Sequence, residues 1–575
     1  MWKLRKYTKP FLPAALTVML LVFLEVMATL RLPDLMSEIV DQGIARSNIG
    51  LIWSTGGTML AVAFGGVVCA ILGSFLASRA STGFGRDLRK AVFTKVEQFA
   101  PQEFNSFGTA SLITRTTNDV QQMQTMFLLS MRMALRAPLM AIGGVLMVVK
   151  KDAQLALILL ALIPVIALVV VFVVAKGIPL FKSLQEKLDR LNQVLREQLM
   201  GVRVIRAFDR GAYEETRFQE ANLDLTKTTL KVNRIMVTMM PLMALLTNFV
   251  SIAIIWFGAK RIDAGLMQVG DMMAFLQYSM QILWSLMMLS MLFVMLPRAS
   301  ASAERIVEVL EISPSIEDPL RPQSIGTVQG VVEFENVTFS YPGAATPVLS
   351  NLSFTARPGE MTAIIGGTGS GKSTVLDLIP RFYDPQSGRI TLDGVDIRDL
   401  TQAELRSRLG YVPQQAVLFS GTIESNIRGG KQTATAEEVA EAARVAQATD
   451  FIQEREEDYN SYIAQGGTNI SGGQKQRLSI ARAVVRQPQV YLLDDTFSAL
   501  DYKTDAKLRT ELAKSAKDST IIVVAQRVST ILHADQIIVL EDGKVVGRGT
   551  HAELLTSCEV YQEIVASQYG EEAVS

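Results

Sequence analysis

Residues 366–374 read GGTGSGKST, a stretch whose residue types and spacing suit the binding of phosphate groups. The stretch matches G-x-x-x-x-G-K-[ST], and it follows an apolar run and precedes a helical pattern, as that motif requires. Glycines let backbone amides approach phosphate oxygens, the lysine neutralises their charge, and the following hydroxyl can hold magnesium. The predicted nucleotide-binding residues are Gly366, Gly367, Thr368, Gly369, Ser370, Gly371, Lys372, Ser373 and Thr374.

Two adjacent acids, Asp494 and Asp495, end a second apolar run further along the chain. After a phosphate loop, the first acid at such a place usually holds magnesium together with the loop hydroxyl, so we predict Asp494 and Ser373 as metal ligands. The second position usually holds a glutamate that orients the attacking water. Asp495 is one methylene shorter, which withdraws its carboxylate by roughly 1.3–1.5 Å. Because a misplacement of about 1 Å can cost on the order of 100-fold in rate, we expect slow hydrolysis of a nucleotide bound at this phosphate loop.

The region from Val331 onward has the pattern of an α/β domain that could position these residues. Residues 331–341 and 388–397 alternate between apolar and polar side chains, as strands do. Short apolar runs at 361–366, 490–495 and 520–526 suit buried parallel strands, and helical patterns separate them.

The first 300 residues are different, because they contain long apolar runs. The chain has 575 residues, of which 49% are hydrophobic, and its mean hydropathy is +0.26. About 20 helical residues cross a bilayer core, and long helices that are apolar all round do not suit a soluble protein. We predict six membrane spans, the first broken only by Glu25 and the third by Arg132 and Arg136. They are Phe11–Leu30, Leu51–Ser78, Gln121–Val149, Leu155–Ala175, Ile235–Ala259 and Met272–Pro297.

Basic residues predict the orientation of these spans. With the N-terminus inside, the inner segments 1–10, 79–120 and 176–234 hold 22 Lys and Arg residues, against six in the outer segments. We therefore place the N-terminus and everything after the sixth span in the cytoplasm, with the spans in the cytoplasmic (inner) membrane. The chain as a whole has 56 basic and 56 acidic residues, so its net charge indicates no nucleic acid partner. Its two cysteines form no metal or disulfide pattern.

The sequence predicts three consecutive parts: a transmembrane domain over 1–305, a linker over 306–330 and a nucleotide-binding domain over 331–575. The linker region contains prolines and shows little periodicity. The two long inner segments have apolar residues at helical spacing, so we expect the spans to continue as helices roughly 35–40 Å into the cytoplasm.

Ile470–Ala483 reads ISGGQKQRLSIARA and resembles the signature of ATP-binding cassette proteins, which other phosphate-loop families lack. Other elements of that family follow in order: Tyr341 after a strand, Gln414 in YVPQ, SALD at 498–501 and AQRVST at 525–530. The first half resembles the membrane domain of the family's exporters, and residues 107–119 and 199–208 look like its coupling segments. The resemblance implies a type IV exporter fold, a membrane all-α domain with six transmembrane helices fused to an α/β P-loop domain.

The resemblance implies that two such chains enclose two ATP molecules, each with Mg²⁺, between the phosphate loop of one chain and the signature of the other. Tyr341 would stack on adenine, although it could also be an ordinary strand tyrosine. Gln414 would contact magnesium and the attacking water, although it could also be a turn glutamine. The signature residues that would complete the other chain's site are Ser471, Gly472, Gly473 and Gln474.

Three positions depart from the family pattern. Asp495 replaces the catalytic glutamate, Gln526 replaces a histidine that contacts the γ-phosphate, and Gln465 replaces a glutamate before the signature. Neither of the two histidines, His533 and His551, stands at position 526. The phosphate loop and signature are complete, whereas the residues that activate water are altered. We therefore expect a heterodimer in which a second half-transporter supplies the catalytic glutamate and switch histidine. A homodimer with two slow sites is the alternative.

Charged residues inside the spans leave several interpretations open. Glu25 could contact a substrate, or it could snorkel or pair with another span. Arg132 and Arg136 lie four residues apart on one helix face, directed either to an internal cavity or to the inner interface.

Residues that could contact cargo occur in the sixth span. Gln277, Gln281 and Trp284 share one helical face, which could line a cavity or pack between helices. Residues 231–300 hold 12 of the 25 methionines, which suits varied apolar ligands or ordinary apolar packing. We expect ATP-driven export of hydrophobic or amphipathic small molecules. Lipid translocation, import through the same fold and an ATP-gated regulator or channel are the alternatives.

Overall fold

The computed structural model describes residues 2–326 and 329–569, apart from some side chains within 162–178, 239–240 and 290–294. The chain divides into two compact units. One contains residues 1–97 and 110–312, and the other contains residues 98–109 and 313–575.

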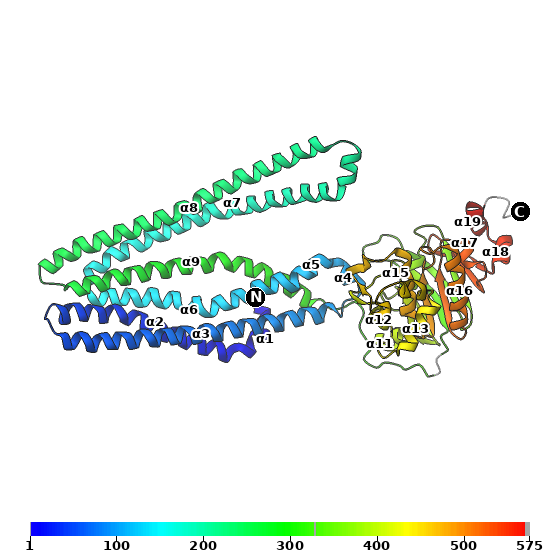
Figure 1. The fold of residues 1–575 in the computed structure, drawn as a ribbon, viewed down its shortest axis with the longest axis horizontal. Helices are drawn as coiled ribbons and strands as arrows, with labels where there is room; N and C mark the ends of the chain where they lie inside the picture. Colours follow the sequence, from blue (N-terminus) through cyan, green and yellow to red (C-terminus); the bar gives the residue numbers. More distant parts are fainter. Residues whose placement is uncertain (1, 327–328, 570–575) are drawn as a thin grey trace. The chain divides into compact units, whose positions relative to one another are not determined.

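The first unit is entirely helical in its described part (Figure 1). Short π-helical turns extend two of its helices, at 39–44 after α2 and at 115–119 before α6. The long helices are α2 (Leu12–Glu38), α3 (Ile49–Val96), α6 (Val120–Lys151), α7 (Ala153–Ala207), α8 (Gly211–Asp263) and α9 (Val269–Glu311).

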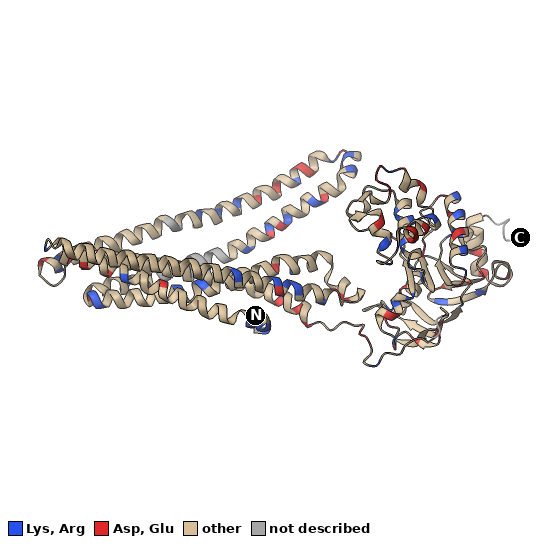
Figure 2. Cartoon of the chain, turned by 60° about the horizontal axis from the view of Figure 1, so that its bottom comes forward, with Lys and Arg blue, Asp and Glu red and all other residues tan. Residues whose placement is uncertain are grey.

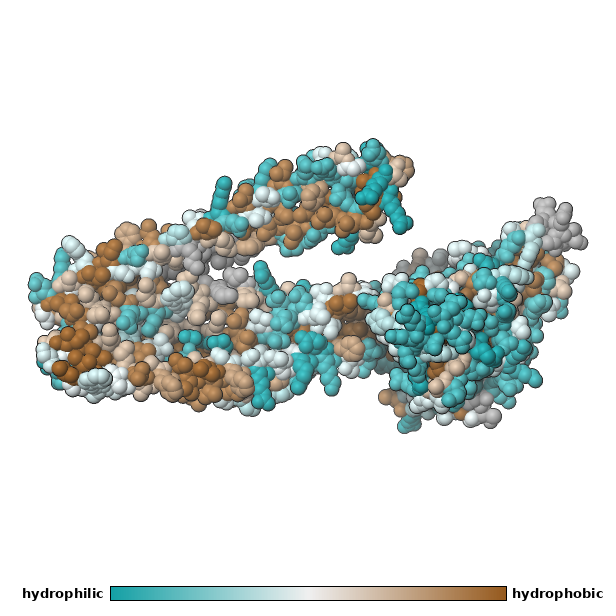
Figure 3. Space-filling view, viewed as in Figure 1, coloured by the Kyte–Doolittle hydropathy of each residue, from teal (hydrophilic) through white to brown (hydrophobic). Residues whose placement is uncertain are grey.

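Five helical stretches among the described residues are long and apolar enough to cross a membrane. They are Arg5–Ile44, Ile49–Val96, Thr109–Lys151, Gly211–Asp263 and Val269–Leu289. Four predicted spans lie within these stretches, and the span predicted at 272–297 overlaps the stretch Val269–Leu289. The span predicted at 155–175 lies on α7, where many side chains are outside the described residues. Figure 2 shows long uncharged segments in these helices, and Figure 3 shows broad apolar surface on this unit. The protein is therefore a multi-pass membrane protein.

The segments predicted as inner extensions are helical. Helix α3 runs without a break to Val96, and α7 runs to Ala207 before a short turn leads into α8. Helix α9 continues to Glu311, so residues 306–311 are helical although the sequence placed them in the linker. No regular element follows in residues 312–326 and 329–331.

Helices α7 and α8 pack mainly against each other, and α2, α3, α6 and α9 form a second group (Figure 1). Within that group Arg136 Nη1 lies 3.0 Å from Glu25 Oε1, so the acid in the first span pairs with the third span. Arg132 is exposed and makes no ion pair or hydrogen bond within the described part of the chain. On α9, Gln277 and Trp284 are exposed.

The second unit is an α/β domain built around a six-stranded sheet with the order β12-β11-β3-β10-β9-β6. All neighbouring pairs are parallel except β11 with β12. Its strands are β3 (Met361–Gly366), β6 (Leu409–Val412), β9 (Val490–Asp494), β10 (Thr520–Val524), β11 (Gln536–Glu541) and β12 (Lys544–Gly549). The runs predicted as buried strands thus form β3, β9 and β10.

A four-stranded antiparallel sheet packs through its apolar face on the central sheet and helix α10. Its strands, in the order β2-β1-β4-β5, are β1 (Val332–Phe339), β2 (Leu349–Ala356), β4 (Ser387–Leu392) and β5 (Val395–Asp396). The helices used below are α10 (Lys372–Leu378), α13 (Ala436–Val445), α15 (Gly472–Val484), α16 (Tyr502–Ser515), α18 (His551–Ser557) and α19 (Glu559–Tyr569).

Candidate nucleotide site

The predicted site residues gather at the carboxyl edge of the central sheet. Four neighbouring parallel strands, β3, β10, β9 and β6, end at this edge, and the register places Val524 opposite both Ile364 and Asp494. The phosphate loop follows β3, and Gln526 follows β10. Asp494 ends β9 with Asp495 directly after it, and Gln414 follows β6. Ligands of parallel α/β sheets bind at this edge.

The phosphate loop has the backbone that its glycines permit. Gly369 and Gly371 have φ angles of 85° and 95°, in the left-handed region that favours glycine. A Cβ at Gly366 would collide with the carbonyl oxygen of Leu540 on the neighbouring strand. The loop is therefore held close to β11 and leads directly into α10.

Lys372 folds over the loop that it follows. Its Nζ donates to the carbonyl oxygens of Gly366 at 2.9 Å and Gly367 at 2.6 Å. Burial lowers the pKa of Lys372, while the negative charges of Asp494 and Asp495 act in the opposite direction. The ammonium group lies where it can exchange these carbonyl contacts for phosphate oxygens.

Ser373 and Asp494 meet as a magnesium site requires. Ser373 Oγ donates to Asp494 Oδ1 at 3.0 Å, and Asp494 is only 5% exposed. Burial raises the pKa of Asp494, and the negative charge of Asp495 adds to this. The described residues contain no cluster of three or more His, Cys, Asp or Glu side chains that could hold a metal by themselves. One carboxylate and one hydroxyl fit Mg²⁺, which keeps water and phosphate oxygens as its other ligands.

The two altered residues contact each other. Gln526 Nε2 donates a hydrogen bond of 3.0 Å to Asp495 Oδ2. Asp495 has a φ angle of 43°, and its amide donates to Val524 O at 2.9 Å, so its backbone is anchored to β10. One oxygen of the shortened carboxylate is therefore already engaged by a neutral amide.

Gln568 supports the segment that carries Gln526, a role that we did not predict. Its Nε2 donates to Gln526 O at 2.8 Å, and its Oε1 accepts from the amide of Val528 at 2.8 Å. Gln568 lies near the end of α19, so only the folded chain brings it to this edge. No local sequence motif marks it.

Tyr341 and Gln414 are the other residues of the nucleotide-binding unit that we predicted to contact ATP or magnesium. Tyr341 is half-buried, its hydroxyl lies 3.0 Å from Thr374 Oγ1, and its ring meets Tyr383 edge-on. Gln414 is exposed and makes no hydrogen bond within residues 2–326 and 329–569. Its side chain is free to contact a ligand at the sheet edge. Stacking of Tyr341 on adenine stays a prediction.

The signature begins α15 with a reciprocal cap. Gln474 N donates to Ser471 Oγ at 3.3 Å, and Ser471 N donates to Gln474 Oε1 at 3.1 Å. Ser471 and Gly472 are exposed. The cap uses the amides of Ser471 and Gln474, so the amides of Gly472 and Gly473 at the positive end of the 13-residue helix can bind an anion.

Gln465 and the histidines do not complete the site on this chain. Gln465 is exposed in a short turn before the signature. His551 Nδ1 lies 2.8 Å from the hydroxyl of Tyr561 between α18 and α19, and His533 follows β10 by several residues rather than occupying the position of Gln526.

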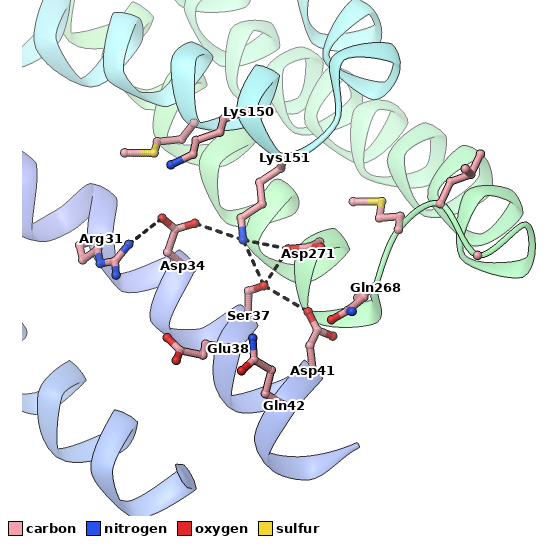
Figure 4. A pocket seen from close by; sticks show the side chains of 14 residues that line it. Arg31, Asp34, Ser37, Glu38, Asp41, Gln42, Lys150, Lys151, Gln268 and Asp271 are labelled. Carbon is pink, nitrogen blue, oxygen red and sulfur yellow. Dashed lines mark hydrogen bonds and ion pairs between the residues drawn. The ribbon is translucent and has the colours of Figure 1, made fainter. Parts of the chain in front are cut away.

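The membrane unit contains a separate polar cavity of about 590 Å³ where α2, α6 and α9 meet (Figure 4). Lys151 Nζ lies 2.8 Å from Asp271 and 3.3 Å from Asp34, and it donates to Ser37 Oγ at 3.2 Å. Asp41 accepts a hydrogen bond of 2.6 Å from the amide of Gly270. This network joins the ends of three helices, and the sequence did not predict it because its members lie far apart in the chain.

Comparison with known proteins agrees with this arrangement. Residues 15–286 match the family of the ABC transporter transmembrane region, and residues 349–498 match the ABC transporter family. An uncharacterized ABC transporter ATP-binding protein of Mycobacterium tuberculosis is 44% identical over 569 residues, which cover 98% of this chain and 97% of that protein. A Bacillus subtilis protein, the uncharacterized ABC transporter ATP-binding protein YfiB, is 39% identical, with coverage of 100% and 99%.

Two further matches are a solved exporter structure and a relative whose name states its cargo. The structure of a bacterial Atm1-family ABC exporter with ATP bound has a TM-score of 0.78 and 26% identity, covering 97% of this chain and 98% of that chain. The fatty acid ABC transporter ATP-binding/permease protein of M. tuberculosis is 35% identical over 478 residues, covering 83% of this chain and 75% of that protein. This chain belongs to the ATP-binding cassette transporters, in the exporter group whose membrane and ATP-binding domains are fused.

Proposed function

We propose that this chain is the degenerate-site half of a heterodimeric exporter that moves hydrophobic or amphipathic small molecules across the cytoplasmic membrane. The observation that carries the proposal is the hydrogen bond between Gln526 and Asp495, the two residues that replace the family's histidine and glutamate. The phosphate loop and the signature keep every residue that binds ATP.

The chemistry of the altered pair explains slow hydrolysis on this chain. Loss of a general base or of its orienting partner typically costs about 10²–10⁴-fold in rate. Asp495 is too short, and its Oδ2 is engaged by Gln526, which brings no positive charge to the γ-phosphate. Lys372, Ser373 and Asp494 still bind ATP with Mg²⁺, which supplies positive charge to the phosphates when bound.

The signature supports a partner that hydrolyses ATP efficiently. Exporters of this fold work as dimers in a lipid bilayer. Ser471, Gly472, Gly473 and Gln474 would complete the ATP site whose phosphate loop, glutamate and histidine belong to the second chain. Leu199 and Met200 near the end of α7 and Phe208 just after it are strongly exposed apolar residues, which supports coverage by another chain.

The proposed transport cycle follows from the different roles of the two ATP sites. ATP binding closes the two nucleotide-binding domains, and the segments at 107–119 and 199–208 transmit closure to the membrane helices. The cavity then changes from inward to outward access, and hydrolysis at the partner's site reopens it. The site with Asp495 retains its ATP through this cycle and acts as a longer-lived connection between the chains.

Three observations support amphipathic cargo. Methionines concentrate in residues 231–300, and such side chains adapt to varied apolar ligands. A relative that is 35% identical is named as a fatty acid transporter. Exposed Gln277 and Trp284 on α9 supply polar and aromatic groups that would contact such molecules.

The proposal is tested by purifying the chain alone and together with a half-transporter that has the glutamate and histidine. We expect the single chain to bind a fluorescent ATP analogue and hydrolyse ATP barely above background, and the pair to hydrolyse ATP and accumulate amphipathic dye in inverted vesicles. Rapid hydrolysis and transport by the single chain would establish the homodimer instead. Passive flux that needs ATP binding but not hydrolysis would favour a gated channel.

A further inference from the structure

Helix α3 exposes a continuous apolar stripe within its unit. Trp53, Leu60, Phe64, Ile71 and Phe75 are each at least 61% exposed. Their separations of four or seven residues, one or two helical turns, place them on one face of the helix. From Trp53 to Phe75 the stripe is roughly 33 Å long, close to the hydrocarbon thickness of about 30 Å. The length matches a surface that faces acyl chains, with Phe75 near one boundary.

The same face becomes basic and polar just beyond that boundary. A cavity of about 490 Å³ opens there, lined by Phe75, Ser78, Arg79, Thr82, Gly83 and Arg86. Arg79 is exposed and has no ion pair or hydrogen bond with any residue that the structure describes, whereas Arg86 pairs with Asp87 at 2.8 Å. Arg79 therefore presents an uncompensated positive charge roughly 6 Å along the helix from Phe75.

This order of groups matches a phospholipid, in which a phosphodiester follows long acyl chains. Basic cavities on the cytoplasmic side of membrane helices bind anionic head groups. The 22 Lys and Arg residues of the predicted inner segments predict that this end of α3 lies at the cytoplasmic leaflet.

We propose that the cavity around Arg79 binds the phosphodiester head group of an anionic phospholipid in the cytoplasmic leaflet, with its acyl chains along the α3 stripe. Arg79 is the principal contact, Arg86 adds a second positive charge, and Ser78 and Thr82 also line the cavity. This site is independent of the degenerate nucleotide site and of the cargo.

The test uses the assembled, partly delipidated transporter and a phosphatidylglycerol with a fluorescent acyl chain. Matched phosphatidylcholine is the zwitterionic probe, and inorganic phosphate is the competitor. Each basic residue near an anionic surface contributes about 1 kcal/mol, so Arg79→Gln should weaken phosphatidylglycerol binding about fivefold and Arg79→Gln with Arg86→Gln about 30-fold. Arg79→Lys should retain most of the affinity.

Arg89→Gln is the matched control, because Arg89 is an exposed arginine of the same helix outside the cavity. The proposal requires that this control binds like the parent and that phosphate does not displace the lipid. An equal loss with Arg89→Gln, equal binding of both lipids, or displacement by phosphate would overturn it. Protection of Arg79 by the second chain, shown by failure of the lipid to bind the assembly, would also overturn it.

Discussion

The two nucleotide-contacting regions of this chain differ in completeness. At the sheet edge, Lys372, Ser373 and Asp494 are arranged to bind phosphate and magnesium, but Asp495 and Gln526 bond to each other where water should be activated. At the start of α15, the signature has a full reciprocal cap, and Gly472 is exposed. Under the proposed function, this chain would bind nucleotide at both regions, whereas efficient cleavage would occur only at the site that its signature completes for another chain.

The largest expected effect is a loss of ATPase activity when the signature at the start of α15 is changed. Ser471→Ala in the assembled pair should lower ATPase activity at least about 100-fold, because the Ser471 hydroxyl accepts the cap hydrogen bond through its oxygen and keeps its proton to donate to the γ-phosphate. Loss of a donor to a developing oxyanion has a cost of this size. Thr435→Ala is the matched control, because Thr435 caps α13 with the same reciprocal geometry away from the site. Each change should cost about 1 kcal/mol of cap stability. An equal loss of activity in both variants would remove the distinction between the two regions.

Replacement of Asp495 and Gln526 by the residues of the family pattern should give the next largest effect. In a pair whose partner lacks its own catalytic glutamate, Asp495→Glu with Gln526→His should raise the residual ATPase at least about tenfold, because it restores a base and its partner. The assay is steady-state phosphate release. Lys372→Ala in the same background should abolish the gain. Unchanged hydrolysis would show that these two residues do not limit the site.

A smaller effect should follow from the support of Gln526. Gln568→Ala removes two hydrogen bonds to the 526–528 segment. If positioning is weakened by about 1 kcal/mol, the hydrolysis gained in the repaired variant should fall about fivefold, with little change in the affinity for ATP. A single-turnover assay separates these quantities. A loss of affinity without a loss of rate would contradict the positioning role.

The last expected effect is on stability rather than on activity, and it depends on the pH beside the phosphate loop. Burial raises the pKa of Asp377 to about 6, although Tyr411 donates a hydrogen bond of 3.1 Å to it. The unfolded state loses this proton near pH 4 and the folded state near pH 6, so this group makes the protein less stable as pH rises between them.

Asp377→Asn should therefore raise the free energy of unfolding by about 1–2 kcal/mol at pH 7.5, after allowance for partial exposure, and leave it nearly unchanged at pH 4. Thermal unfolding of the full chain at both pH values measures this. Equal stabilisation at both pH values would show that ionisation is not the cause.

Motifs that depend on neighbouring residues could be predicted from the sequence, but contacts between distant segments could not. The phosphate loop, the signature cap and the long inner helices follow from local spacing, and the structure has them. The partner of Glu25 is on another helix, the support from Gln568 comes from the last helix, and Lys151 bridges three helices. The linker predicted over 306–330 did not anticipate that α9 continues to Glu311, because this last turn lies beside proline-rich sequence with no strong stop signal before it.

The two chains of the proposed pair should differ in the nucleotide that each retains. The assembled pair can be loaded with radiolabelled photoreactive ATP, allowed many turnovers, cross-linked, and separated into its two chains. The account predicts that nucleotide on this chain is mainly triphosphate, while the partner carries diphosphate. Diphosphate on both chains, formed at the same rate, would contradict it.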